Sequence, residues 1–403
     1  MPVPEPTAAE QPPSAASPGP HAHPSPHPDR AGRPATLPRS ARVVIVGAGQ
    51  AGLSVAYHLR RRGLTPGTDL VLLDRGPGAG GAWQFRWESL RLGTAHRVND
   101  LPGMSELGLS FDTADHGRAA RDVVGEYYRR YEEFFGLAVF RPVEVTSVTD
   151  APDESRRLRI HVSTDRDTID TDVLVNASGT WATPFRPYYP GAETFAGEQI
   201  GTPQFRDAQH FAGKRVIVVG GGTSATGFVL ELEGIAAHTT WVTRRPVEFV
   251  DDDKNLEGRL AAVAEQDEAA RAGRVLPSII SGTGLPATER NRAAVARGTL
   301  VARPPFSRIE SGGVHFADGS FEPADAIIWA TGFRAELSHL APLKLREQSG
   351  GVAVERGRSL RDPRVFLAGY GPQASTIGAN RAGRLVALQV LDALQHPGHP
   401  EPA

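Results

Sequence analysis

The sequence predicts an α/β protein with two nested, doubly wound sheets, and two local patterns carry this prediction. A continuous β-branched run at 43–46 leads into the turn GAGQAG, which opens a stretch with helical spacing. A second such run at 215–219 leads into GGGTSA, again before a helical stretch. A strand, a glycine-rich turn and a helix in this order are typical of Rossmann-like units that bind dinucleotides. Two such units predict two dinucleotide-binding domains.

Composition sets the outer limits of this interpretation. The 403 residues suffice for two or three domains, and 40% hydrophobic with 22% charged residues is typical of a globular chain. A net charge of -2 provides no basic field for nucleic acid. The absence of cysteine excludes disulfides and thiol redox chemistry, and no pattern predicts a metal site. No apolar run approaches a membrane span and no signal peptide is evident, so we expect a cytoplasmic protein without membrane contact.

The first glycine turn has the context that a dinucleotide site needs. Gly47 permits the tight turn, Gly49 lets the backbone approach a pyrophosphate, and Gly52 lets helix and strand pack closely. The helix N-terminus offers N–H groups to the phosphates, and Asp74, at the end of the next strand, can accept hydrogen bonds from ribose hydroxyls. The residues expected to contact cofactor in this unit are Gly47, Gly49, Gln50, Ala51, Gly52, Asp74 and Arg75.

The second glycine turn differs at the end of its partner strand. That strand, 239–243, is followed by Arg244 and Arg245 and has no carboxylate. An acid there would repel a 2′-phosphate, whereas arginines form charge-assisted hydrogen bonds to it. This favours NADPH at the second site and FAD at the first, although two solvated surface arginines are the alternative. The residues expected to contact NADPH are Gly220, Gly222, Thr223, Ser224, Ala225, Arg244 and Arg245.

The other elements follow from periodicity and turn residues. Residues 121–136 predict an amphipathic helix whose apolar stripe belongs to the core. Residues 139–176 predict short strands around a turn at 152–153, and 256–272 and 288–297 predict helices. Further strands are expected at 312–316, 326–329 and 365–368, and a last helix at 382–394. Residues 1–40 contain 12 of the 33 prolines, so we expect a disordered leader there.

From residue 42 to 394 the chain resembles the flavin-containing monooxygenase superfamily. GAGQAG with LLDR resembles its FAD site, and Gly80-Gly81-Ala82-Trp83 resembles its GGxW element. Residues 175–180 resemble its first ATG-like segment, 328–333 its interdomain linker, and 365–371 with 375–384 its closing FAD segment. The cofactor contacts that this resemblance implies are Gly81, Trp83, Ala177, Gly179, Thr331, Gly332, Gly369 and Ile377.

One motif departs from the family pattern. The monooxygenases carry FxGxxxH before the second glycine turn, but the stretch here begins at Phe195 and ends with Gly201 in place of the histidine. The active-site asparagine of the family has no clear counterpart, and Asn99 is a candidate only by its neighbourhood. No side chain is assigned as catalytic acid or base, because the cofactor performs the hard chemistry.

The resemblance implies the following organisation and activity. The FAD domain would comprise 41–205 and 331–403, with the NADPH domain inserted at 206–330. NADPH would reduce the flavin, which with dioxygen would form a C4a-(hydro)peroxyflavin and oxygenate a small substrate at nitrogen, sulfur or a carbonyl carbon. The glycine at 201 keeps an alternative open, a reductase that passes electrons to a quinone, a ferredoxin or oxygen. A non-enzymatic NADPH-binding or redox-sensing protein is the third possibility.

Overall fold

The computed structural model describes residues 36–151, 159–251, 256–277, 284–374 and 376–396. All elements named below belong to the compact unit that begins at Leu37. Most of the expected leader, and the turn expected at 152–153, lie outside the described residues. Within the expected leader, Leu37 is buried in the core, and the carbonyl of Arg39 accepts the N–H of Asp170 at 3.0 Å. The packed structure therefore starts a few residues before Arg42.

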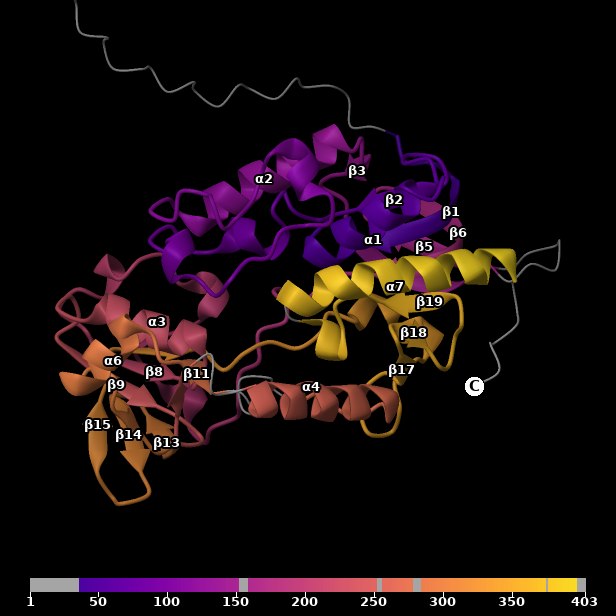
Figure 1. Ribbon diagram of the computed structural model, residues 1–403. Coiled ribbons are helices and arrows are strands. Elements are labelled where there is room, and N and C mark those ends of the chain that lie inside the picture. The colour runs from indigo at the N-terminus through magenta and orange to yellow at the C-terminus, as the bar shows by residue number, and fades with distance from the viewer. Residues whose placement is uncertain (1–35, 152–158, 252–255, 278–283, 375, 397–403) are drawn as a thin grey trace, which may run out of the picture. The chain divides into compact units, whose positions relative to one another are not determined.

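The larger sheet has nine strands and contains the first glycine turn (Figure 1). Its main path runs β17-β18-β19-β6-β1-β2-β3, and β5 joins β4 to β6. β1 is parallel to β2 and β6, and β6 is parallel to β19. The bounds are β1 Ser40–Val46, β2 Leu70–Leu73, β3 Val139–Phe140, β4 Val145–Ala151, β5 Arg159–Thr164, β6 Thr168–Asn176, β17 Val354–Glu355, β18 Arg358–Ser359 and β19 Val365–Leu367.

Three helices pack with this sheet, α1 (Gln50–Arg60), α2 (Ala120–Phe134) and α7 (Thr376–Gln395). α1 and α7 lie side by side (Figure 1). They approach so closely that a Cβ on Gly383 would stand 2.0 Å from Ser54 Oγ. α7 begins six residues before the predicted 382–394 helix and ends one residue after it.

The second sheet has five parallel strands in the order β12-β9-β8-β16-β7. The bounds are β7 Glu198–Gly201, β8 Arg215–Val219, β9 His238–Val242, β12 Ala302–Arg303 and β16 Ala326–Trp329. The helices α3 (Thr223–Leu232), α4 (Leu256–Arg271) and α6 (Glu289–Ala296) follow in the sequence. An antiparallel sheet, β13 (Phe306–Glu310), β14 (Gly313–Phe316) and β15 (Phe321–Pro323), and the pair β10 (Phe249–Val250) and β11 (Leu285–Pro286) complete this half.

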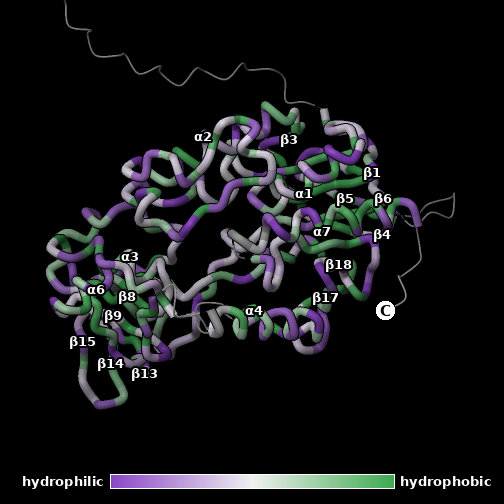
Figure 2. Tube along the Cα trace, in the orientation of Figure 1, coloured by the Kyte–Doolittle hydropathy of each residue, from purple (hydrophilic) through white to green (hydrophobic). Residues whose placement is uncertain are grey.

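The α/β fold predicted from the sequence is confirmed. Apolar residues gather along the strands of both sheets (Figure 2). β1 shows why its run is continuously apolar, because Val43 and Ile45 belong to one core cluster while Val44 and Val46 belong to the cluster on the opposite face. Full burial of such a side chain contributes about 1.5–3 kcal/mol.

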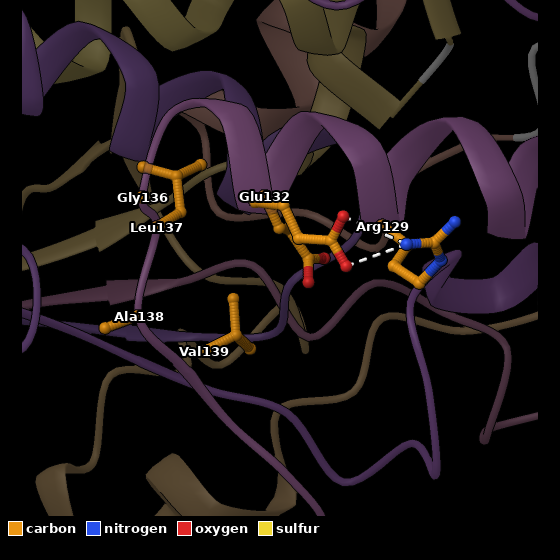
Figure 3. Close-up of a pocket in the computed structure, with 7 residues that line it drawn as sticks. Arg129, Glu132, Gly136, Leu137, Ala138 and Val139 are labelled. Carbon is orange, nitrogen blue, oxygen red and sulfur yellow. Dashed lines mark hydrogen bonds and ion pairs between the residues drawn. The ribbon is translucent and has the colours of Figure 1, made fainter. Parts of the chain in front are cut away.

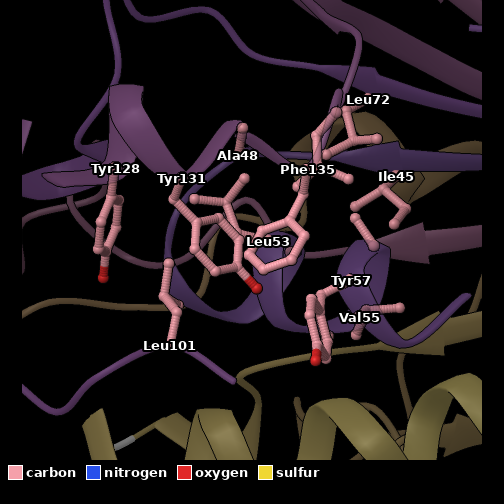
Figure 4. Close-up of a cluster of buried hydrophobic side chains, with 14 of the residues drawn as sticks. Ile45, Ala48, Leu53, Val55, Tyr57, Leu72, Leu101, Tyr128, Tyr131 and Phe135 are labelled. Atoms are coloured by element: carbon pink, nitrogen blue, oxygen red, sulfur yellow. The ribbon is translucent and has the colours of Figure 1, made fainter. Parts of the chain in front are cut away.

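The aromatic stripe of α2 belongs to the core, as predicted. Val123, Val124, Tyr128 and Tyr131 are at most 1% exposed, and Phe135 follows directly after the helix. Tyr131 and Phe135 lie with Tyr57 of α1 in one aromatic cluster (Figure 4). The Tyr131 hydroxyl donates to the carbonyl of Pro102 at 2.7 Å, so this large side chain is buried with its polar atom satisfied.

Candidate functional site

The three glycines of the first turn differ in why each position requires glycine. Gly47 has φ 102°, and a Cβ there would lie 2.4 Å from the Ala177 carbonyl oxygen. A Cβ on Gly52 would lie 1.9 Å from the carbonyl oxygen of Gly47. A Cβ on Gly49 would meet only Gly81 Cα, at an ordinary 3.8 Å. Packing therefore requires the first and third glycines, while the second leaves an open cradle at the start of α1.

Three distant segments converge on this turn. A Cβ on Gly81 would stand 2.7 Å from Gly49 Cα, so the segment 80–83 lies against the turn. A Cβ on Gly369 would lie 3.2 Å from Ala51 Cβ, which places the closing segment beside the start of α1. The N–H of Ala177 donates to the Val46 carbonyl at 2.8 Å. The structure thus gathers most of the residues predicted to contact FAD. Ile377 is the second residue of α7, and its side chain is outside the described part of the structure.

Asp74 has a set of partners that the sequence did not predict. Its Oδ2 accepts the N–H of Ala48 at 2.7 Å, and its Oδ1 accepts the N–H of Gly76 at 2.7 Å. Arg141 Nε lies 3.7 Å from Oδ1 and forms paired hydrogen bonds of 2.6 and 2.7 Å to Glu132. Desolvation raises the pKa of Glu132. Asp74 therefore holds the turn in shape. Each of its carboxylate oxygens keeps a second lone pair, which could accept a hydrogen bond from a ribose hydroxyl. Arg75 beside it is exposed.

The second glycine turn repeats the geometry of the first. Gly220 has φ 143°, and a Cβ there would lie 2.1 Å from the Ala330 carbonyl oxygen, as Gly47 lies against Ala177. The N–H of Gly220 donates to the Val242 carbonyl at 2.9 Å. Gly222 is the extended residue before α3, which begins with Thr223 and Ser224. Ala225 is fully buried, as the third position of such a turn requires for close packing.

Arg244 and Arg245 lie just after β9, at the same edge as this turn. Both are exposed, and neither has an ion pair or hydrogen bond to another side chain in the described part of the chain. Thr243 before them is buried. The structure thus leaves two guanidinium groups available next to the strand end.

The linker residues pair with the segment that follows β6. The N–H of Phe185 donates to the Gly332 carbonyl at 2.8 Å, and the N–H of Glu336 donates to the Gly179 carbonyl at 2.9 Å. The Thr331 hydroxyl donates to the Phe185 carbonyl. Gly179 and Gly332 have φ 70° and 86°, which explains why glycine occupies both positions. The linker that contains Thr331 and Gly332 is therefore hydrogen-bonded to the segment that contains Gly179, and the contact of these residues with a cofactor stays a prediction.

The site also contains a cluster that the sequence analysis missed. The Arg86 guanidinium lies 4.1 Å from the ring centroid of Trp181 and 5.4 Å from that of Trp83. Trp181 stacks on Phe333 at 5.0 Å, and the His96 ring lies 4.8 Å from that of Trp83. Desolvation lowers the pKa of Arg86 to about 10. Desolvation and the nearby Arg86 charge lower the pKa of His96 to about 4. Trp83 and Arg86 are three positions apart, but the other contacts join residues 10 or more positions apart, so no local pattern predicts the cluster.

Gly201 and Asn99 belong to different segments. Gly201 ends β7, pairs with Trp329 of β16, and has an extended backbone with φ −95°. Its N–H donates to Gln204 Oε1 at 3.0 Å. Asn99 is half-buried in the loop before Asp100, whose carboxylate accepts the N–H of Phe111 at 2.7 Å.

A shallow hollow at the end of α2 is separate from these residues. It is lined by residues of the 129–139 segment, among them Glu132 and Leu137 (Figure 3). Arg129 and Glu133 form an ion pair at its rim, at 2.7 Å. None of the residues predicted to bind cofactor lines it. Among the described residues, every helix is too short or too polar to cross a lipid bilayer.

Comparisons with known proteins agree with this geometry. The family described as pyridine nucleotide-disulphide oxidoreductase matches residues 44–270. A flavin-containing monooxygenase from Stenotrophomonas maltophilia is 32% identical, with a TM-score of 0.71, and the match covers 88% of this chain and 98% of that one. An uncharacterized oxidoreductase, CzcO, of Bacillus velezensis is 25% identical over 80% of this chain and 90% of its own length. The indole-3-pyruvate monooxygenase YUCCA1 of rice is 28% identical over 73% of this chain and 77% of its own.

Proposed function

The chain belongs to the flavin-containing monooxygenase superfamily, which makes it a flavoprotein oxidoreductase, and from this premise we propose that it uses FAD, NADPH and dioxygen to oxygenate a small organic molecule. The observation that carries the proposal is the pair of glycine turns with the same geometry, each sealed by the carbonyl after a neighbouring strand. Two dinucleotide sites in a chain without cysteine favour electron transfer from a nicotinamide to a flavin and onward to a small acceptor.

FAD is assigned to the first turn. The open cradle at Gly49 gives a pyrophosphate room to approach the N-terminus of α1, where N–H groups and the helix dipole favour negative charge. Gly81 lies against Gly49 of this turn, Gly369 lies against Ala51, and Trp83 follows two residues after Gly81. Ala177 and Gly179 extend the same surface along the end of β6.

NADPH is assigned to the second turn. Gly222 and the first residues of α3 provide the same type of helix N-terminus. Arg244 and Arg245 are exposed at the adjoining strand end and have no competing carboxylate. They would hold the 2′-phosphate by charge-assisted hydrogen bonds, which is the reason to prefer NADPH to NADH.

The domain division follows from these assignments. We place the FAD domain at 41–205 and 331–403 and the NADPH domain at 206–330. The larger sheet supports this division, because it contains β19, which comes after the second sheet in the sequence. The linker at 331–336, hydrogen-bonded to 179–185, would join the two domains.

The cofactor supplies the redox chemistry, since a flavin reduced by NADPH activates dioxygen and transfers one oxygen atom to a substrate while the other leaves as water. The protein's contribution is to position the reactants and to exclude water. The residues that bring the segments together do the positioning: Asp74 shapes the first turn, and Thr331 and Gly332 are hydrogen-bonded to Phe185 in the segment after β6.

Gly201 supports a second candidate function, an NADPH-dependent reductase of a quinone, a ferredoxin or oxygen. The family histidine is missing, and the glycine at position 201 offers no side chain in its place. The experiment that decides supplies ¹⁸O₂ and NADPH to the purified protein with panels of amines, sulfides, ketones and 2-oxo acids. We expect one labelled oxygen atom in a product for each NADPH consumed beyond the peroxide leak. NADPH oxidation that yields only peroxide or a reduced acceptor would establish the reductase instead.

A further inference from the structure

Arg86 is a half-buried cation in an aromatic setting. Its guanidinium packs against the rings of Trp181 and Trp83, at 4.1 and 5.4 Å from their centroids. Aromatic packing of this kind engages the π face of a guanidinium and leaves its in-plane N–H donors for other partners. Because those donors form a planar fork, they suit a carboxylate, which can accept two parallel hydrogen bonds.

Among the described residues, no group accepts a hydrogen bond from those donors. Arg86 Nε is fully buried without a hydrogen-bond partner, and no carboxylate pairs with the guanidinium in the described part of the chain. Other enclosed arginines are paired: Arg141 with Glu132, and Arg364 with Asp362. Partial desolvation of an unpaired cation is unfavourable, and an anion that pairs with it offsets this cost. Burial lowers the pKa of Arg86 only to about 10, so the side chain is charged at neutral pH.

The surroundings of Arg86 add no compensating charge. The pKa of His96 is lowered to about 4, so its ring, 4.8 Å from that of Trp83, is neutral at pH 7. Trp181 is stacked on Phe333 at 5.0 Å. The cluster thus combines one positive charge with several aromatic rings, which suits an organic anion with an apolar body.

The position of the cluster connects it to the proposed reaction. Trp83 lies two residues after Gly81, which abuts the first glycine turn, and Trp181 and Phe333 lie two residues after Gly179 and one after Gly332. The phosphates of both dinucleotides are assigned to the N-termini of α1 and α3, so neither needs Arg86. We propose that Arg86 binds the carboxylate of the substrate, an organic acid whose apolar part contacts Trp83 and Trp181. This inference rests on the proposed function, because it names the substrate class of the same site.

The test is calorimetric titration of the FAD-loaded protein with phenylacetate and, as its neutral counterpart, phenylacetamide. We expect the wild type to bind the acid at least several-fold more tightly than the amide. Arg86→Gln should weaken binding of the acid roughly 10- to 100-fold and leave the amide unchanged, because a hydrogen bond to a charged group is lost. Arg86→Lys keeps the charge without the planar fork and should fall between the two.

Arg186→Gln is the matched control. Arg186 also lies over a tryptophan, with its guanidinium 5.1 Å from the Trp329 ring centroid, but it already donates to Gln199. This variant should bind both probes as the wild type does. FAD content and NADP⁺ affinity are measured on every variant, because a cofactor phosphate is the other anion that Arg86 could meet.

Two outcomes would overturn the inference. One is a wild type that does not distinguish acid from amide, a result that needs no variant to fold. The other is an Arg86→Gln protein that loses FAD or NADP⁺ and binds the acid normally. Calorimetry detects binding without turnover, so a protein that binds the acid at Arg86 and forms no oxygenated product would disprove the proposed function and leave this inference intact.

Discussion

At the scale of single residues, Gly49 separates cofactor binding from folding. Its backbone is extended, with φ −83°, and an added Cβ meets only Gly81 Cα at 3.8 Å, so alanine fits the protein alone. We expect Gly49→Ala to fold with an unchanged melting temperature in the cofactor-free form and to lose FAD, because the methyl group occupies the approach of the pyrophosphate. The measurement is flavin absorbance per protein after purification.

Gly227→Ala is the matched control for this prediction. Gly227 lies within α3 with no atom within 4 Å of an added Cβ, so the substitution should keep FAD and stabilise the helix by roughly 0.5–1 kcal/mol. A Gly49→Ala protein that retains full FAD would show that the flavin pyrophosphate lies elsewhere.

Arg244 and Arg245 are the residues that we predict to select NADPH over NADH. The double variant Arg244→Ala/Arg245→Ala should lose about 1.5–3 kcal/mol of selectivity for NADPH, since a charge-assisted contact to the 2′-phosphate disappears. Use of NADH should change little, because NADH lacks that phosphate. The measurement is kcat/KM for both nicotinamides in both proteins. Equal use of the two by the unmodified protein would contradict the assignment.

His339 predicts a pH dependence of stability. It is buried, its Nε2 lies 2.9 Å from Asn176 Oδ1, and desolvation, with Arg75 opposing the attraction of Glu336, lowers its pKa to about 4. The unfolded chain therefore binds more protons than the folded chain between about pH 6.5 and 4. The stability that neutral His339 contributes is complete above pH 6.5 and is lost as pH falls through this window, by about 2 kcal/mol at pH 5.

Chemical unfolding at pH 7 and pH 5 checks this effect. His339→Gln cannot titrate and keeps an N–H donor for Asn176, so its free energy of unfolding should decline less between the two pH values than that of the wild type. An identical decline in both proteins would assign the pH dependence to other histidines, such as His58, whose pKa is also lowered to about 4.

At the scale of elements, β7 presents Gly201 in a form that accepts a side chain. Its φ is −95°, outside the left-handed region, and an added Cβ meets the mobile end of Gln204 at 3.0 Å. Gly201→His should therefore fold and, by restoring the family residue, lower the hydrogen peroxide released per NADPH. Gly201→Ala is the control for the Cβ alone and should leave the leak as it is. Equal leakage from all three proteins would mean that position 201 has no part in coupling.

The elements that could be predicted from the sequence are those marked by several characteristic residues within a short stretch of the chain. β8 was predicted residue for residue, and α2, α4 and α6 were predicted within one or two residues, because glycine turns and apolar periodicity are read over short windows. β7 was missed, since four residues ending in glycine carry no strand pattern and owe their pairing to β16. The partners of Asp74 and the Arg86 cluster were missed for the same reason: they join residues that only the tertiary fold brings together.

At the scale of the whole molecule, the packed unit has a sharp beginning. Leu37 is 6% exposed within the core cluster of Val44 and Leu174, and Arg39 bonds to Asp170. Deletion of residues 1–36 should leave the melting temperature unchanged, whereas deletion of 1–39 should lower it, because loss of a buried leucine typically costs about 2–5 kcal/mol. Leu37→Ala in the full chain is the matched variant, and thermal melts of all three proteins decide.

The contact of Gly47 with Ala177, repeated by Gly220 with Ala330, has an evolutionary consequence. Positions 47 and 220 are constrained by the polypeptide itself, and drift there abolishes the fold whether or not a cofactor is ever bound. Position 49 is constrained only by the ligand, so a descendant that no longer needs flavin is free to change it and still inherit an intact scaffold. A change at position 49 can therefore remove flavin binding while the fold is kept. A descendant that no longer binds flavin would be recognised by a glycine at position 47 and another residue at position 49.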